Sequence, residues 1–400
     1  MENRLLSQRL QNISFSQTIA MAAKARELKK RGYDIINLSL GEPDFSPPNF
    51  ILNAAKKAID EGYHYYTPVS GYLDLRKVIC EKFYRDNHLK YTPSQIVVST
   101  GAKQAIMNLL LSLLNKNDEV IIPAPYWVSY YQMVRLCESY PVVIPTTMEN
   151  NFKIHPEQLE RAITSKTKLF IFSTPCNPTG SIYSYQELKD LSNIFKKHPE
   201  VMILSDEIYE YISYSKEPVT SIAIFPDIYN QVITLNGISK AFSMTGWRIG
   251  YIGAPEWISK SCDKIQGQMT SCANSIAQRA AICALKSNPS EIEYMIKKFK
   301  KRRDLVLNMI KKIDGFQLNN KPDGAFYVFP KISFFFGKKL HGKIIKNADD
   351  FSELLLNKAR VATVSGSAFG NDECLRISYA SSEDKIIEAF KRIKKTLTLI

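Results

Sequence analysis

The sequence lacks the features that mark several classes of protein. Its seven cysteines are odd in number, widely spaced and without a Cys-x-x-Cys pair, so neither a disulfide framework nor a metal site is indicated. No apolar run approaches the ~20 residues that a helix needs to cross a bilayer. Residues 1–10 lack the apolar core of a secretory signal. We therefore expect a cytoplasmic protein without a membrane partner.

The chain also has no internal repeat, no low-complexity block and no nucleic-acid-binding signature. Lys and Arg number 53 against 39 Asp and Glu, which gives a net charge of +14. The basic run 297–303 fits the solvated face of a helix better than a nucleic-acid site. The excess charge is consistent with steering of anionic ligands and equally with drift in composition. We expect no nucleic-acid partner, and steeply salt-dependent DNA binding would be needed to revive one.

What the sequence does have is a large apolar fraction arranged in alternating strands and helices. With 400 residues and 45% hydrophobic residues, it can bury an extensive core. Thr100 is expected to cap a helix over 102–113, and Ser184 with Glu187 forms a capping box. The alternation predicts a parallel or mostly parallel sheet covered on both faces. The predicted strands are 95–99, 119–122, 168–173, 201–204, 231–235 and 247–252, and the other helices are 156–163 and 184–198.

The two ends of the chain have a different pattern. An amphipathic helix over 18–31 precedes an extended stretch at 34–38. A long charged helix, about 290–313, leads to strands at 324–328 and 374–378 and a helix from 383 to about 396. This pattern predicts a large α/β domain and a smaller α+β domain built from both ends. We assign an N-terminal arm and part of the small domain to 1–48, the large domain to 49–288, and a linking helix with the rest of the small domain to 289–400.

The most specific signal is the segment 237–250, GISKAFSMTGWRIG, which directly follows a predicted strand. Lys240 lies in a turn of small residues, and Arg248 follows eight positions later between Gly246 and Gly250. A lysine that acts as an amine nucleophile needs a pocket, a lowered pKa and an aldehyde partner. The segment therefore favours a functional lysine over a surface one.

This segment resembles the active-site signature of class I, fold-type I pyridoxal-phosphate aminotransferases, and the resemblance extends from Ser16 to the C-terminus. It is most similar to the bacterial aspartate aminotransferases of subgroup Ib. The resemblance implies an α/β fold with a mostly parallel seven-stranded central sheet flanked by helices, and a smaller α+β domain. It also implies that Lys240 holds pyridoxal 5'-phosphate covalently and that Arg248 pairs with its phosphate.

Other segments offer what this cofactor requires. Asp206 ends an apolar strand, where ligands of open α/β sheets bind, although the pattern alone also fits a helix cap. A pyridine nitrogen that must stay protonated needs such a carboxylate. The resemblance assigns Asp206 to that nitrogen, Tyr209 to the 3-hydroxyl oxygen, and Asn177 to this hydroxyl and the substrate carboxylate. Taken alone, Trp127 at the end of a strand is more typical of a core residue. By resemblance, it matches the aromatic residue that stacks on the cofactor ring.

The phosphate is expected at the turn 99–103, because a strand-to-helix turn presents free backbone amides. By resemblance, the backbone of Gly101, Ala102 and Lys103 cradles this phosphate. Tyr66 matches a residue that family members donate to the phosphate of the neighbouring subunit. The resemblance therefore implies a homodimer with shared active sites, in which a monomer is inactive.

An α-carboxylate of the substrate is expected at Arg376, whose guanidinium is a bidentate partner for carboxylates. Alternation in 374–378 sends Arg376 to the face opposite Leu375 and Ile377, although a surface salt bridge fits the same pattern. Gly41 matches a substrate-contacting loop glycine of the family. For a distal carboxylate, the resemblance points to Lys103 and the segment that holds Thr18, while Lys103 also fits a solvated first-turn lysine. Ser14-Phe15 departs from the Lys-Pro of many relatives.

The resemblance implies ping-pong transamination of aspartate with 2-oxoglutarate to give oxaloacetate and glutamate. In this scheme Asp206 keeps the cofactor ring cationic, and the freed Lys240 amine moves the proton from the substrate Cα. An aromatic or prephenate aminotransferase on the same fold is the nearest alternative. A pyridoxal-phosphate lyase or acyl-transferring synthase is a more distant one.

Overall fold

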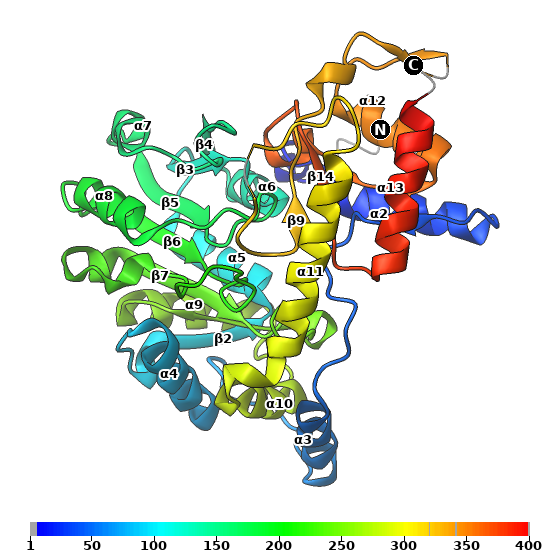
Figure 1. The fold of residues 1–400 in the computed structure, drawn as a ribbon. Helices are drawn as coiled ribbons and strands as arrows, with labels where there is room; N and C mark the ends of the chain where they lie inside the picture. The colour runs from blue at the N-terminus through cyan, green and yellow to red at the C-terminus, as the bar shows by residue number, and fades with distance from the viewer. Residues whose placement is uncertain (1–5, 320, 341, 399–400) are drawn as a thin grey trace.

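A seven-stranded sheet forms the centre of the computed structural model, which describes residues 6–319, 321–340 and 342–398. The first five residues of the predicted N-terminal arm therefore lie outside the described residues. The strand order is β2-β8-β7-β6-β5-β3-β4 (Figure 1). All pairs from β7 to β4 are parallel, whereas β8 is antiparallel to both β2 and β7, so the predicted mostly parallel sheet is confirmed. The strands are β2 (Ile96–Thr100), β3 (Glu119–Ala124), β4 (Tyr140–Pro145), β5 (Thr167–Ser173), β6 (Met202–Asp206), β7 (Val232–Gly237) and β8 (Ile249–Gly253).

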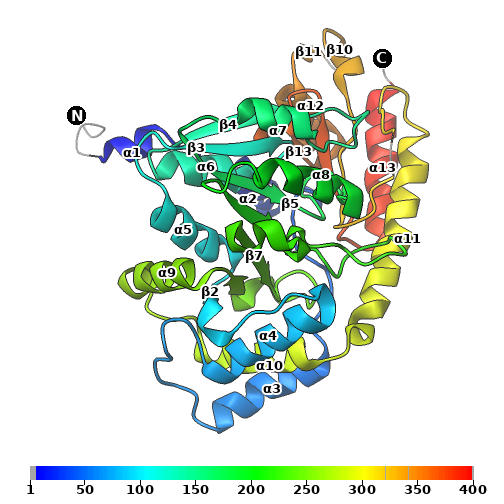
Figure 2. The ribbon, with the colours of Figure 1, turned by 90° about the vertical axis from the view of Figure 1, so that its left-hand side faces the viewer.

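Helices cover both faces of this sheet, which explains why its strands are apolar runs rather than alternating sequences. On β3, Ile121 packs into one hydrophobic core, while Val120 and Ile122 pack into the other. The helices α5 and α9 pack together near β2, and α10 packs against both α3 and α4 (Figure 2). These and the remaining sheet helices are α3 (Asn49–Asp60), α4 (Leu73–Asn87), α5 (Ala102–Leu113), α6 (Val128–Leu136), α7 (Pro156–Ala162), α8 (Tyr185–Phe195), α9 (Glu256–Met269) and α10 (Ser275–Lys286).

Two helix starts test the predicted capping residues. The capping box of Ser184 and Glu187 is present at the start of α8, as predicted. The predicted cap at Thr100 is wrong, because Thr100 is still the last residue of β2 and Gly101, with φ of +81°, caps α5 instead. The amide of Gln104 accepts a hydrogen bond from the Thr100 N–H, so a side chain inside the helix closes this turn.

The chain ends build a smaller region from short strands and helices. A three-stranded antiparallel sheet is ordered β13-β14-β9, and β1 pairs with β12 in parallel. The predicted strand 324–328 is reduced to β9, because Gly324 pairs with Ser213 in an isolated bridge. The elements are α2 (Gln17–Lys30), β1 (Ile36–Asn37), β9 (Tyr327–Val328), α12 (Ala348–Leu354), β12 (Val361–Ala362), β13 (Val364–Ser365), β14 (Leu375–Ser378) and α13 (Glu383–Leu397).

One long helix, α11 (Glu293–Ile310), connects the two regions. It starts near α10 and runs alongside α13, and in Figure 1 it lies between the large sheet and α13. The segment after β1 crosses back from the smaller region toward the large sheet. Among the helices in the described ranges, none is long and apolar enough to span a membrane.

Candidate active site

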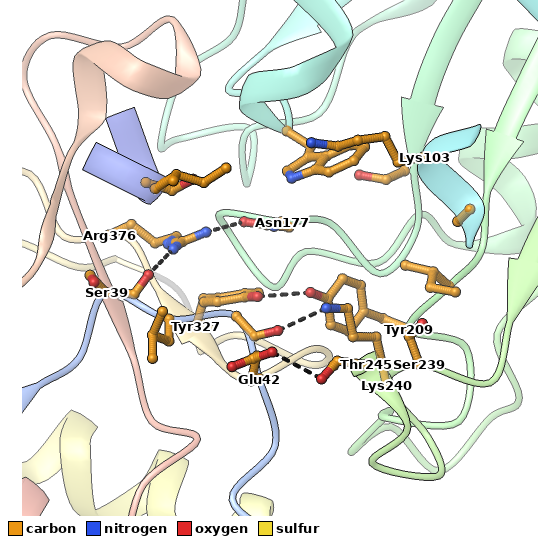
Figure 3. Close-up of a pocket in the computed structure, with 18 of the residues that line it drawn as sticks. Ser39, Glu42, Lys103, Asn177, Tyr209, Ser239, Lys240, Thr245, Tyr327 and Arg376 are labelled. Carbon is orange, nitrogen blue, oxygen red and sulfur yellow. Dashed lines mark hydrogen bonds between the residues drawn. The ribbon is translucent and has the colours of Figure 1, made fainter. Parts of the chain in front are cut away.

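A cavity of about 500 Å³ lies where the carboxyl ends of the large-sheet strands meet the segment after β1 and the strands β9 and β14 (Figure 3). This position agrees with the rule that ligands of open α/β sheets bind beyond the carboxyl ends of the strands. The cavity gathers residues that are far apart in the sequence. Those predicted as site residues are Thr18, Gly41, Ala102, Lys103, Trp127, Asn177, Asp206, Tyr209, Lys240, Arg248 and Arg376.

Lys240 follows β7 and extends its amine into the cavity. The Nζ atom donates a hydrogen bond to the Gly41 carbonyl oxygen at 2.8 Å (Figure 3). Burial lowers the pKa of the Lys240 amine to about 8, because a charged amine loses its hydration there, while the Glu42 carboxylate opposes this shift. A substantial fraction of neutral amine near neutral pH is what a nucleophilic lysine requires.

Asp206 is the last residue of β6 and is buried at the floor of the cavity. The Tyr130 hydroxyl donates to its Oδ2 at 2.5 Å, and the Ile208 N–H donates to its Oδ1 at 3.2 Å. Burial raises the pKa of this carboxyl to about 6, against the effect of these hydrogen bonds. Tyr130 was not predicted from the sequence, but its place three residues after Trp127, in the first turn of α6, is a usable signal.

Two tyrosines form one wall of the cavity. The hydroxyls of Tyr209 and Tyr327 lie 2.8 Å apart, and burial raises the pKa of Tyr209 well above its usual value (Figure 3). Tyr327, on β9, was also missed by the sequence analysis. A Cβ atom on Gly41 would lie 2.5 Å from the Tyr327 hydroxyl oxygen, so any side chain at position 41 would displace this wall.

Arg376 lies on β14 and is buried, with 2% of its surface exposed. Its Nη1 donates to Asn177 Oδ1 at 3.0 Å, and its Nη2 donates to the Ser39 carbonyl oxygen at 2.5 Å (Figure 3). The Nε atom is buried and finds no acceptor in the part of the chain that the structure describes. Because an arginine carries five N–H donors, this guanidinium keeps donors for an anion in the cavity.

Arg248 and the start of α5 form an anion-binding corner. Arg248 Nη1 donates to the Thr245 carbonyl oxygen at 2.8 Å. A Cβ on Gly101 would lie 2.1 Å from Arg248 Nη2, and a Cβ on Gly250 would lie 2.2 Å from the Ala102 nitrogen. Glycine at both positions therefore lets the arginine and the helix N-terminus meet. The first N–H groups of an α-helix such as α5 have no acceptor within the helix and can bind an anion.

The first turn of α5 carries a second cation beside this corner. Lys103 Nζ lies 5.1 Å from the Trp127 ring centroid, and burial lowers the pKa of this lysine, with Arg248 adding to the effect. Thr18 approaches from α2, which also lines the cavity with Ile19 and Arg26. These two α2 residues were not predicted. Arg26 lies two helical turns after Thr18, a spacing that could have found it, whereas no such spacing marks Ile19.

Two predicted site residues are not among the residues that line the cavity. Gly101 lies just behind it against Arg248, and its N–H donates to the Ser99 carbonyl oxygen at 2.7 Å. Tyr66 lies outside the cavity with 90% of its surface exposed. The predicted contact of Tyr66 with the phosphate of a second subunit needs two chains, so it stays a prediction.

The sequence profile of the family "aminotransferase class I and II" matches residues 33–393. The chain belongs to this family. It is 47% identical over 392 residues to a probable aspartate/prephenate aminotransferase of Rhizobium leguminosarum bv. phaseoli, with 98% of each chain covered. The crystal structure of aspartate aminotransferase from Rhizobium meliloti superposes with a TM-score of 0.95 at 40% identity, over 98% of both chains. Aspartate aminotransferase from Thermus thermophilus with maleate gives a TM-score of 0.91 at 36% identity, over 98% of this chain and 99% of that one.

This aminotransferase uses pyridoxal phosphate, and the fold is the predicted fold type I. The residues in the cavity fit the chemistry of this cofactor. An aldehyde requires an amine with a lowered pKa, a pyridine nitrogen requires a buried acid, and a phosphate requires an arginine beside a helix N-terminus. One cavity offers all three: the amine of Lys240, the acid of Asp206, and Arg248 beside the start of α5.

Proposed function

We propose that this aminotransferase transfers the amino group of aspartate to 2-oxoglutarate in two half-reactions, giving oxaloacetate and glutamate. The observation that carries the proposal is a single cavity lined by the Lys240 amine, the Asp206 carboxyl and two further cations, Arg376 and Lys103. Two cations suit a substrate with two carboxylates. The names of the relatives support this substrate class, and the Thermus enzyme was crystallised with maleate, a four-carbon dicarboxylate.

We propose roles for the residues around the cofactor. When bound, pyridoxal phosphate supplies an aldehyde that condenses with amines and a ring that accepts electrons from the substrate Cα. Lys240 anchors it and then moves the proton at the substrate Cα as general base and acid. Asp206, held by Tyr130, keeps the ring nitrogen protonated, and Tyr209 donates to the ring hydroxyl. Further cofactor contacts are those of Asn177, Trp127, Arg248 and the backbone of Gly101, Ala102 and Lys103.

Substrate binding follows from the remaining donors. Arg376 binds the α-carboxylate through its free donors. The hydrogen bond from Arg376 Nη1 to Asn177 Oδ1, at 3.0 Å, holds the guanidinium in place. We assign the distal carboxylate to Lys103 and Thr18, because both line the cavity and Lys103 supplies a second cation there. The Gly41 backbone lines the cavity beside the Lys240 amine, which donates to its carbonyl oxygen.

An aromatic or prephenate aminotransferase is the second candidate, favoured by the name of the Rhizobium leguminosarum relative. Prephenate also carries two carboxylates, so Lys103 suits it as well. Steady-state kinetics with aspartate, phenylalanine, tyrosine and prephenate separate the two, with the absorbance of the bound cofactor recorded throughout. We expect the highest kcat/KM for aspartate and a spectral change that an oxo acid reverses. A spectrum that oxo acids do not reverse would instead indicate a lyase or synthase.

We further infer a cytoplasmic homodimer in which Tyr66 contacts the phosphate held by the neighbouring subunit. The adjacent rings of Tyr65 and Tyr66 are 83% and 90% exposed, which is unusual for large aromatic side chains and typical of an interface. Sedimentation should give the mass of two chains. Tyr66→Phe should weaken cofactor binding without changing that mass, and a fully active monomer would contradict the proposal.

A further inference from the structure

Four residues of the segment 39–44 each form a hydrogen bond or ion pair with a side chain from another part of the chain. The Ser39 carbonyl oxygen accepts from Arg376, and the Gly41 carbonyl oxygen accepts from Lys240. Glu42 Oε1 accepts from the Thr245 hydroxyl at 2.9 Å (Figure 3). Asp44 forms a two-pronged ion pair with Arg302 of α11 at 2.6 and 3.0 Å. The segment thus links the expected carboxylate arginine and the cofactor lysine to the long connecting helix.

Glu42 differs from the other residues of this segment because it brings a negative charge to a cavity of cations. The cavity is lined by five cationic side chains and two carboxylates, Glu42 and Asp206. After burial, Glu42 has the largest effect on the pKa of Lys240, which it raises, and it exceeds the effect of Asp206. The groups that face the Lys240 amine are Glu42, Asp206, Arg248, Arg376 and the Tyr209 ring at 5.9 Å.

We propose that Glu42 is a positioning residue of the reaction: its hydrogen bond to Thr245 holds the 39–44 segment over Lys240, and its charge offsets the surrounding arginines at that nitrogen. The geometry supports both parts. Thr245 lies in the turn that precedes Arg248, so this hydrogen bond joins the segment to the same loop that supplies the arginine. The Gly41 carbonyl, one residue earlier, then points at the lysine nitrogen.

The proposal fixes the sign of a pH effect. Glu42 favours the protonated form of the Lys240 nitrogen, whereas Arg248 and Arg376 disfavour it. Without the Glu42 charge the effect of the two arginines is less balanced, so the nitrogen holds its proton less tightly. The nitrogen remains cationic over a narrower pH range, whether free or linked to the cofactor. Loss of a purely structural contact would weaken binding at every pH and leave the midpoint of the titration in place.

The test is a pH titration of the holoenzyme, followed by the absorbance of the cofactor linked to Lys240 and needing no turnover. Glu42→Gln keeps an oxygen that can accept from Thr245 and removes only the charge. We expect its midpoint to fall by ~0.5–1 pH unit, a partial effect because Glu42 is solvent-exposed. Thr245→Val keeps the charge and removes the donor, and it should shift the midpoint in the same direction by less.

Glu291→Gln, on η6 (Pro289–Ile292), is the matched control, because it removes one negative charge outside the cavity and should leave the midpoint unchanged. An unchanged midpoint in Glu42→Gln, or an equal shift in the control, would overturn the inference. A larger shift in Thr245→Val than in Glu42→Gln would overturn the role of the charge. The inference rests on the proposed function only in that Lys240 holds the cofactor. If the wild-type enzyme shows no lysine-linked absorbance, the proposed function fails instead.

Discussion

The segment from Asp206 to Glu210 sends side chains into two regions that both contain buried charge. Asp206 and Tyr209 line the cavity, whereas Glu207 and Glu210 lie in a buried ionic cluster against α4. We define this buried ionic cluster as Lys82, Asp86, Asn87, Glu207 and Glu210. The two regions, the cavity and the buried ionic cluster, therefore lie on either side of this one stretch of chain, and both contain lysine and carboxylate side chains.

The two regions differ in how their charges are satisfied. In the cluster, Lys82 pairs with Glu210 and donates to Asn87 at 2.7 Å, and Asn87 in turn donates to Glu210 at 2.9 Å. In the cavity, cations outnumber carboxylates, and Asp206 is held by a tyrosine rather than by a cation. Breaking an internally satisfied buried pair from one side destabilises the fold, whereas charges left open in the cavity are available to a ligand. The comparison predicts opposite outcomes for substitutions on the two sides.

The largest effect is expected on the cavity side, for Lys240→Ala. Turnover of aspartate with 2-oxoglutarate should fall by at least ~10⁴-fold, because the variant lacks both the anchor and the proton-transferring amine. In the protein without cofactor, the free energy of unfolding should fall much less than on breaking a buried ion pair, because the Lys240 amine donates its hydrogen bond to a neutral carbonyl oxygen, that of Gly41. Kinetics and urea unfolding check the two expectations. Normal turnover in this variant would end the functional proposal.

On the cluster side, Lys82→Met should reduce stability strongly. Lys82 is fully buried, so the variant leaves the Glu210 carboxylate without its cation. Breaking a buried pair from one side costs about 3–5 kcal/mol of the free energy of unfolding. Urea unfolding measures this loss, and the turnover of the folded fraction should stay within several-fold of wild type. A loss below about 1 kcal/mol would show that the cluster is not the structural element we describe.

Glu207 offers a smaller effect that depends on pH. Burial raises the pKa of Glu207 to about 7, so the folded state holds this proton more tightly than the unfolded state does. Its contribution to stability is therefore fully present below about pH 4.5 and is lost as the pH rises to about 7. Glu207→Gln should remove this loss, so that its free energy of unfolding at pH 8 exceeds that of the wild type by an amount on the order of 2 kcal/mol. Unfolding at pH 5 and pH 8 gives the comparison, and equal pH slopes in both proteins would contradict it.

The smallest effect concerns substrate choice at the cavity mouth. Lys103→Met keeps an unbranched side chain that is one atom shorter and removes the charge beside Trp127. The preference for aspartate over a monocarboxylic amino acid such as alanine should fall about 10-fold, mainly through KM for aspartate. The ratio of kcat/KM for the two substrates measures it. An unchanged ratio would assign the distal carboxylate to another cation, with Arg26 on α2 as the next candidate.

The sequence predicted the parts of the fold and site that depend on local patterns. The alternation of apolar strands and capped helices predicts β2, β3 and β5 to β8 in their order along the chain but misses β4. The signature around Lys240 predicts where the site lies. The division into domains at residues 48 and 288 stays a prediction.

Features that arise from tertiary packing were missed. Tyr327 and Glu42 reach the site from separate elements, and no periodicity marks them as neighbours of Tyr209 or Lys240. The direction of β8 was missed for the same reason, since a strand sequence carries no sign of its pairing direction. The cap of α5 was assigned to Thr100 because its hydroxyl suits that role, whereas close contact with Arg248 requires glycine next to it.

The central claim is that Lys240 alone carries the cofactor. Reduction of the purified holoenzyme with borohydride fixes the bond between an amine and the cofactor aldehyde, and peptide mass spectrometry then locates the label. We predict a phosphopyridoxyl group on the peptide that contains Lys240, in close to one copy per chain, and its loss in Lys240→Ala. A label on Lys103 or another lysine, or no label on protein incubated with pyridoxal phosphate, would contradict the account.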